Sequence, residues 1–227
     1  MWRNHVRHAR NILPAIEGGS LFDLEPIPGL MHRPDYIDAD EEAALIAEID
    51  KRPWSLELQR RRQWYGWAYD DTPLGDDGYR SDPMPDWLRP LARRLHADGY
   101  FDGEPDRALV NEYTPGQGIG AHKDRDIERI KSVAIISVGS GITMEFARPG
   151  RAVRCQYLQP LSLVIMCGEV REDWTHGIVG RLNDKVGGLV IPRKRRLSLT
   201  FRYLNPAPSS PAPGRGAGPP AGPPGRG

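Results

Sequence analysis

The stretch Arg196-Leu-Ser-Leu-Thr-Phe-Arg202 decides the fold class, because polar and apolar side chains alternate along its whole length. Successive side chains of a β-strand point to opposite faces, so this alternation predicts a strand whose polar face begins and ends in arginine. Two interpretations remain open: the polar face is exposed to solvent, or it faces the interior of a barrel that holds an anion. Arg196 and Arg202 would be roughly 20 Å apart along such a strand.

The rest of the chain is typical of an α+β protein. Asp38–Asp50 and Asp86–Gly99 repeat apolar residues at the helical period and predict two amphipathic helices. From residue 107 onward, short β-branched runs alternate with glycines and prolines, which indicates a sandwich or barrel with helices packed on one outer face. The predicted strands are Arg107–Tyr113, Ser132–Val138, Thr143–Ala147, Leu161–Cys167, Gly188–Ile191 and Arg196–Leu204.

Two short motifs carry potential metal ligands. His122-Lys-Asp124 places an imidazole and a carboxylate two residues apart, so both can point at one ion from an extended segment. His176 follows the predicted strand Leu161–Cys167, and we expect it at a strand-to-loop junction, where functional residues gather. Each motif alone is weak evidence, since most histidines are surface or hydrogen-bonded residues. Together, two imidazoles and one carboxylate match a non-haem Fe(II) site that keeps positions open for oxygen and a cosubstrate.

Composition limits the remaining possibilities. The 227 residues are 39% hydrophobic and predict one domain with one substantial core. A formal charge of +1 neither requires nor excludes a nucleic-acid partner. Cys155 and Cys167 lie in or beside apolar stretches, so reduced thiols and a cytoplasmic location are expected. No apolar run approaches the roughly 20 residues of a membrane span. We expect residues 1–29 to be an N-terminal extension and the Pro/Gly-rich residues 206–227 to be a disordered tail.

The ligand motifs and the arginine strand lie within longer segments that match a known family. These segments are Val110-Asn-Glu-Tyr-Thr-Pro-Gly-Gln-Gly-Ile-Gly-Ala-His-Lys-Asp124, Trp174-Thr-His-Gly-Ile178 and Arg196–Arg202. Together they resemble the AlkB family of Fe(II)- and 2-oxoglutarate-dependent dioxygenases. The resemblance covers residues 30–205, with a catalytic core at about 105–205. It implies a double-stranded β-helix (jelly roll) with N-terminal helices packed on it and a substrate lid.

The resemblance also implies a role for each residue of the pattern. The iron ligands would be His122, Asp124 and His176. The 2-oxoglutarate contacts would come from Asn111, Tyr113, Arg196, Ser198 and Arg202. Arg196 would pair with the distal carboxylate of 2-oxoglutarate, and Arg202 would lie near the carboxylate at the metal end. Because the family often has Asn where this chain has Ser198, one of these hydrogen bonds is expected to be weaker or absent.

Three further residues would contact the substrate. Trp67 and Tyr69 belong to the implied lid, where aromatic faces suit base stacking, and Asp126 matches a carboxylate that contacts the substrate base in some members. Ordinary packing of a surface hairpin is the alternative for the two aromatic residues.

The implied activity is oxidative demethylation or hydroxylation of alkylated or modified nucleobases in DNA or RNA, with tRNA as one candidate. Its cofactors would be Fe(II), 2-oxoglutarate and O2, and its products would include succinate and CO2. Basic residues in Arg60–Arg62 and Lys123–Lys131 are consistent with this partner. Two alternatives remain: the same chemistry on a protein side chain or small metabolite, and a non-catalytic nucleic-acid-binding module. We expect a monomer with no membrane partner.

Overall fold

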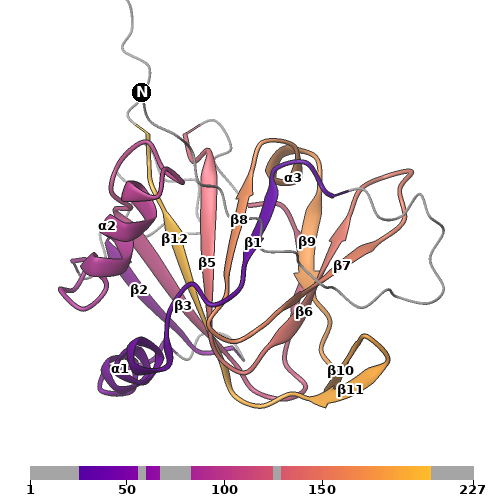
Figure 1. Cartoon of the computed structure of the whole chain (residues 1–227), viewed down its shortest axis with the longest axis horizontal. Coiled ribbons are helices and arrows are strands. Elements are labelled where there is room, and N and C mark those ends of the chain that lie inside the picture. Colours follow the sequence, from indigo (N-terminus) through magenta and orange to yellow (C-terminus); the bar gives the residue numbers. More distant parts are fainter. Residues whose placement is uncertain (1–25, 56–59, 67–82, 125–128, 206–227) are drawn as a thin grey trace, which may run out of the picture.

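The computed structural model describes residues 26–55, 60–66, 83–124 and 129–205, and its core is a pair of antiparallel β-sheets (Figure 1). The larger sheet has the strand order β1 (Leu30–Arg33), β8 (Leu163–Cys167), β5 (Ser132–Gly139), β12 (Arg196–Arg202), β3 (Arg107–Tyr113) and β2 (Arg62–Gly66). The smaller sheet has the order β4 (Ile119–His122), β9 (Thr175–Ile178), β6 (Ile142–Ala147) and β7 (Arg154–Leu158). The predicted α+β jelly roll is confirmed.

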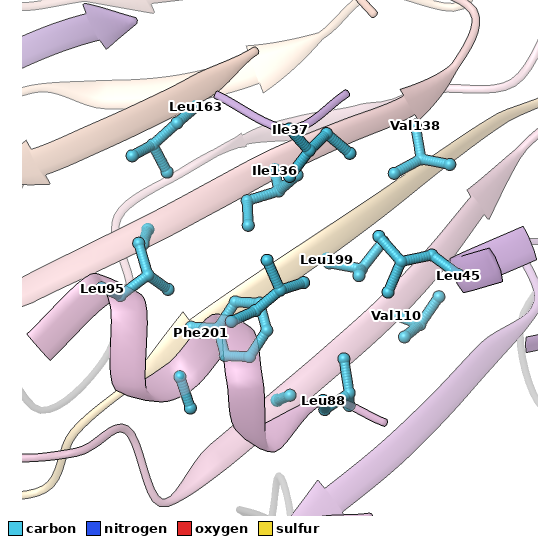
Figure 2. Packing of buried hydrophobic residues seen from close by; sticks show 14 of the residues in the cluster. Ile37, Leu45, Leu88, Leu95, Val110, Ile136, Val138, Leu163, Leu199 and Phe201 are labelled. Atoms are coloured by element: carbon cyan, nitrogen blue, oxygen red, sulfur yellow. The ribbon is translucent and has the colours of Figure 1, made fainter. Parts of the chain in front are cut away.

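Two hydrophobic clusters hold these layers together. One lies between the sheets and includes Val133 and Val164 from the larger sheet and Phe146 from the smaller sheet. The other lies under α1 (Ala39–Asp50) and α2 (Arg89–Ala97), which cover the outer face of the larger sheet. Figure 2 shows Leu199 and Phe201 of β12 beside Leu45, Leu88 and Leu95 of this second cluster. The predicted placement of helices on one outer face is therefore confirmed.

Helix α1 begins where the sequence predicts it, because its N-terminus is capped in both directions. The backbone N–H of Glu41 donates to the Asp38 carboxylate at 2.8 Å, and the backbone N–H of Asp38 donates to the Glu41 carboxylate at 3.2 Å. This capping box satisfies backbone donors that have no partner within the helix. Helix α2 begins three residues later than expected, at Arg89, and Gly99 with a φ of +81° follows its end.

The two faces of β12 separate as the alternation predicts. Leu197, Leu199 and Phe201 belong to the cluster beneath the helices, whereas Ser198 and Thr200 line a cavity between the sheets. Every residue of β12 except Arg202 is buried, so the interpretation of a solvent-exposed polar face is wrong. The strand lies between β3 and β5 and pairs with both along its full length. The polar face therefore looks into the interior of the sandwich.

Other boundaries differ from the prediction for local reasons. β8 begins at Leu163 rather than Leu161, because Leu161 has a φ of +65° and belongs to the preceding turn. β10 (Asn183–Val186) and β11 (Leu189–Pro192) form a hairpin whose turn residues, Gly187 and Gly188, both have positive φ. A short helix, α3 (Glu169–Glu172), connects β8 to β9. Among the described helices, none has both the length and the apolarity that crossing a bilayer requires.

Candidate active site

The three predicted metal ligands converge at one end of the space between the sheets. His122 is the last residue of β4 and pairs directly with His176 of β9, with ring centroids 4.5 Å apart. Asp124 follows two residues after His122, and one ligand atom from each of the three residues lies within 4.8 Å of the others. The prediction that His176 lies at a strand-to-loop junction is wrong, because it is inside β9. Strand pairing is what brings the two imidazoles together.

Burial and nearby charges give these side chains the protonation states that cation binding requires. Burial lowers the pKa of His176 to about 4, so its imidazole is neutral at pH 7. Burial alone would raise the pKa of Asp124, but electrostatic interactions with Arg202, His176 and Arg171 outweigh it and hold the pKa at about 2. Arg202 donates from Nη2 to Asp124 Oδ1 at 2.9 Å, and Arg171 Nη1 lies 3.2 Å from Asp124 Oδ2. A neutral imidazole and an ionised carboxylate are therefore available together.

Arg171 is the residue at this site that sequence reasoning missed. It belongs to α3, its side chain is 2% exposed, and its Nε donates to the backbone carbonyl of Ile130 at 2.6 Å. This anchor places the guanidinium against the Asp124 carboxylate. In the sequence, Arg171 could be noticed only as an arginine in the short segment between an apolar strand and His176. That position does not distinguish a buried arginine from an exposed one.

Arg196 lies at the other end of the same face of β12 with an incomplete set of partners. The residue is 1% exposed, and its Nη2 donates to Ser137 Oγ at 2.9 Å. Within the described part of the chain, no group accepts a hydrogen bond from its Nε or Nη1. Burial lowers its pKa to about 10, which still leaves the guanidinium charged at pH 7. A buried cation with two free donors fits a carboxylate, because an uncompensated charge is strongly unfavourable in such a place.

Strands β3 and β12 place the remaining predicted cosubstrate residues between these two ends. Tyr113 pairs with Arg196, and Asn111 pairs with Ser198, so all four side chains share the inner face. Asn111, Tyr113, Ser198 and Arg202 line one cavity together with His122, Asp124 and His176. The hydrogen bond from Arg202 to Asp124 puts Arg202 at the same end of the cavity as the His122, Asp124 and His176 cluster.

The predicted substrate residues Trp67, Tyr69 and Asp126 lie outside the described residues. Tyr65, just before them, does not face the site. It is buried in the cluster beneath the helices, with its ring edge-on to Trp87 at a centroid distance of 5.7 Å. This aromatic residue is a core residue of the helix-covered face.

A larger cleft of about 400 Å³ lies on the opposite face of the smaller sheet. Ala121, Glu145 and Gly177 line it, and each is the sequence neighbour of a residue that faces the interior. Glu145 is the only ionisable residue among its lining residues, all of which are described. The smaller cavity with the His-Asp-His cluster is therefore the better candidate for chemistry.

The family model described as the 2OG-Fe(II) oxygenase superfamily matches residues 34–202 of this chain. The chain belongs to that superfamily, as an AlkB-like member. This AlkB-like protein is 35% identical over 178 residues to an uncharacterised protein of Acanthamoeba polyphaga mimivirus, with 75% of the chain and 82% of the relative covered. It is 29% identical over 210 residues to the probable RNA/DNA demethylase ALKBH6 of Danio rerio, with 79% and 87% covered.

Two further comparisons concern length and fold. The AlkB-like chain is 29% identical over 206 residues to the tRNA (carboxymethyluridine(34)-5-O)-methyltransferase alkbh8 of Xenopus tropicalis, with 80% of the chain but only 32% of that relative covered. The chain thus spans about a third of the length of this relative. The solved structure of OsALKBH1 has a TM-score of 0.56 at 18% identity and covers 78% of the chain and 98% of itself, which shows the shared fold.

Membership makes this protein an Fe(II)- and 2-oxoglutarate-dependent dioxygenase, an oxidoreductase that uses O2. The third interpretation, a non-catalytic binding module, is therefore wrong. The residues also fit the cofactors on physical grounds. Two imidazoles and a carboxylate suit Fe(II) with open positions, and the two free donors of buried Arg196 suit a carboxylate of 2-oxoglutarate.

Proposed function

We propose that this AlkB-like dioxygenase demethylates or hydroxylates a modified nucleobase in DNA or RNA, with tRNA among the candidate substrates. The observation that carries the proposal is the His122, Asp124 and His176 cluster at one end of the inner face, with the charged, incompletely paired Arg196 at the other end of β12. A metal site and an anion site on the same inner face are what this oxidation requires.

In this proposal His122, Asp124 and His176 bind the iron. When bound, Fe(II) with 2-oxoglutarate and O2 supplies the oxidant for an unactivated C–H bond. The protein contributes donors that already have the required protonation states, because burial keeps His176 neutral and the arginine charges keep Asp124 ionised. Arg202 and Arg171 fix the orientation of the Asp124 carboxylate before any metal arrives.

The inner face of β3 and β12 binds 2-oxoglutarate. Arg196 pairs with the distal carboxylate, and Asn111, Tyr113 and Ser198 supply further polar contacts along the cosubstrate. Arg202 lies near the carboxylate at the metal end, where it also pairs with Asp124. The apolar residues Met144, Ile135 and Met166 line the same cavity and limit water around the reacting groups.

Recognition of a nucleobase is supported by two observations. The relatives of this chain include a probable RNA/DNA demethylase, which matches over most of its length, and a tRNA methyltransferase. Lys123, which lies between the ligands His122 and Asp124 in the sequence, and Lys131 are both exposed, where they can meet phosphate groups. We further propose that Trp67, Tyr69 and Asp126 contact the base.

We also propose that residues 30–205 form the catalytic domain, which the match to residues 34–202 supports. The two cysteines of the chain are free thiols, which supports a cytoplasmic protein that acts in DNA repair or RNA modification.

The decisive experiment supplies purified protein with Fe(II), ascorbate and 2-oxoglutarate. Nucleosides from tRNA and from alkylated DNA are then analysed by mass spectrometry before and after treatment. We expect loss of one modified nucleoside together with release of succinate, and neither change with His122→Ala. Peptide pools tested in parallel identify a protein substrate, and stimulation of succinate release by peptides alone would contradict the nucleobase proposal.

A further inference from the structure

Arg60 lies at the cavity that contains the metal-ligand cluster, although the sequence places it in a basic run suited to nucleic acid. It precedes β2 and lines the cavity together with Asn111 and Tyr113. Its Nε donates to Asn111 Oδ1 at 2.9 Å, and its guanidinium carbon lies 5.4 Å from the centre of the Tyr113 ring. Arg60 therefore contacts both of the β3 side chains that we assign to 2-oxoglutarate.

The contact with Asn111 determines which way its amide points. An asparagine side chain has an acceptor oxygen on one branch of a planar group and two N–H donors on the other. Because a guanidinium only donates, Arg60 can bind only the oxygen branch, and the N–H donors must then occupy the other branch. The carboxylates of 2-oxoglutarate only accept hydrogen bonds. The orientation that Arg60 selects is therefore the one that serves the cosubstrate.

The contact with Tyr113 also fixes a side chain that we assign to 2-oxoglutarate. The Tyr113 ring has the Arg60 guanidinium at 5.4 Å and the Arg196 guanidinium at 5.5 Å. Each cation is attracted to the electron-rich ring, so both contacts restrain the aromatic side chain. A ring held in this way keeps its hydroxyl in one position at the cavity wall.

The two arginines that follow Arg60 have different environments. Arg61 donates to the Glu112 carboxylate from Nε at 2.5 Å and from Nη2 at 2.8 Å. Glu112 adjoins Asn111 on β3 and therefore points to the opposite face of the sheet. Arg62 lies over the Trp64 ring at 5.4 Å. Among these three arginines, Arg60 is thus the one that binds Asn111 Oδ1.

We propose that Arg60 is a positioning residue for 2-oxoglutarate, which acts by fixing the Asn111 amide and the Tyr113 ring. This proposal rests on the proposed cosubstrate contacts of Asn111 and Tyr113. It removes Arg60 from the basic run that the sequence assigns to nucleic acid.

The first test measures 2-oxoglutarate binding to Mn²⁺-loaded protein by calorimetry, which needs no nucleic-acid substrate. We expect Arg60→Gln to raise the dissociation constant for 2-oxoglutarate about tenfold, since one oriented hydrogen bond to a charged group is weakened. Arg60→Lys keeps a donor and a charge and should give an intermediate value. Arg61→Gln removes the same charge one residue away, on the opposite face of the sheet, and should change the constant less than twofold.

Steady-state kinetics of succinate release provide a second, independent test of the proposal. Arg60→Gln should raise KM for 2-oxoglutarate about tenfold and leave kcat within about twofold, because the contacts are made before the chemical step. The affinity for Mn²⁺ alone should stay the same. Thermal melting of each variant establishes that it is folded, and an equal effect of Arg61→Gln would overturn the proposal by assigning the change to general charge.

A double-mutant cycle tests whether Arg60 acts through Asn111. If it does, Arg60→Gln combined with Asn111→Ala binds 2-oxoglutarate nearly as well as Asn111→Ala alone. Independent, multiplying effects would show that Arg60 does not act through the Asn111 amide and would overturn the proposal as stated. Failure of the proposed function looks different: Asn111→Ala and Arg196→Lys would then both leave 2-oxoglutarate binding unchanged.

Discussion

The two buried charges of the site differ in how they are compensated. Asp124 already has two cationic partners, Arg202 and Arg171, whereas the guanidinium of Arg196 has two donors without an acceptor among the described residues. The carboxylate is therefore oriented before a metal binds, and the guanidinium is left ready for an external anion. Both conditions arise from burial, because in water each group would be satisfied by solvent.

At the residue scale, Arg196 should not be replaceable by lysine. Lysine retains the charge but has no planar fork that can donate two parallel bonds to a carboxylate. We expect Arg196→Lys to raise KM for 2-oxoglutarate at least about tenfold, equivalent to about 1.4 kcal/mol of lost binding. Steady-state assays of succinate release check this, and an unchanged KM would remove Arg196 from the cosubstrate site.

Arg171 should matter for metal affinity although it is not a ligand. Partners that orient a ligand typically change metal affinity about 10- to 100-fold when removed, so we expect Arg171→Gln to weaken Mn²⁺ binding about tenfold. Titration followed by electron paramagnetic resonance gives the affinity directly. Arg148→Gln is the matched control, because Arg148 contacts Glu169 of α3 but not Asp124. Equal affinities for wild type and Arg171→Gln would contradict this role.

At the scale of elements, β12 connects the core beneath the helices to the site. One of its faces packs beneath α1 and α2, and the other contributes Arg196, Ser198 and Arg202 to the interior. A shift in register by one residue would exchange these faces, so the hydrophobic core fixes the position of the cosubstrate residues. Packing and function thus depend on the same strand pairing with β3 and β5.

The hairpin β10–β11 depends on a buried ion pair. Arg193 donates to Asp184 from Nε at 2.6 Å and from Nη2 at 2.8 Å, and both side chains are almost fully buried. Arg193 also donates to the carbonyl of Val179 at 2.8 Å. We expect Asp184→Asn to lower the free energy of unfolding by about 3 kcal/mol, because it leaves a buried cation without its counter-charge. Arg93→Gln, in an exposed pair, should change it by less than about 0.5 kcal/mol.

The same pair gives a pH dependence with a definite sign. Burial works to raise the pKa of Asp184, but hydrogen bonds from Arg193 and Thr143 outweigh it and hold the pKa below its ordinary value. A carboxyl with a depressed folded-state pKa stabilises the fold above its unfolded pKa of about 3.9, and this stability is lost as the pH falls. Chemical denaturation from pH 7 to pH 3 should therefore show a loss in wild type that is smaller in Asp184→Asn. Parallel pH profiles would contradict the assignment.

At the scale of the whole molecule, metal binding should stabilise the fold. A ligand that binds only the folded state at 100 times its dissociation constant adds about 2.7 kcal/mol. For a domain of this size that corresponds to a rise in Tm of about 5–10 °C. We expect Mn²⁺ to raise Tm relative to protein in EDTA, and His122→Ala to abolish the difference. A metal-dependent rise that persists in His122→Ala would place the ion elsewhere.

Long, strongly alternating segments could be predicted from the sequence. β3 has the predicted bounds, because its inward and outward residues alternate and Pro115 and Gly116 follow it closely. β4 and β9 were not predicted, since each has only four residues and includes glycine, and their strand character depends on pairing with each other. Short elements of this kind form because of tertiary context rather than local preference.

The residues of the candidate site also fall into two groups: those that the sequence predicts and those that only the fold reveals. The residue types of His122, Asp124 and His176 indicate a metal centre, but their convergence depends on a pairing across more than fifty residues of sequence. Arg171 and Arg60 could not be assigned, because arginines at most positions are solvated. Their roles follow from burial and from the partners that the fold brings to them.

The central place of β12 has a consequence for how the protein is made in the cell. Among the described strands it is synthesised last, yet it fills the gap between β3 and β5. While the nascent chain is still on the ribosome, these two strands carry open edges that invite aggregation. A premature stop before Arg196 would leave that gap permanently, so such a fragment should accumulate as insoluble material rather than as a weakly active enzyme.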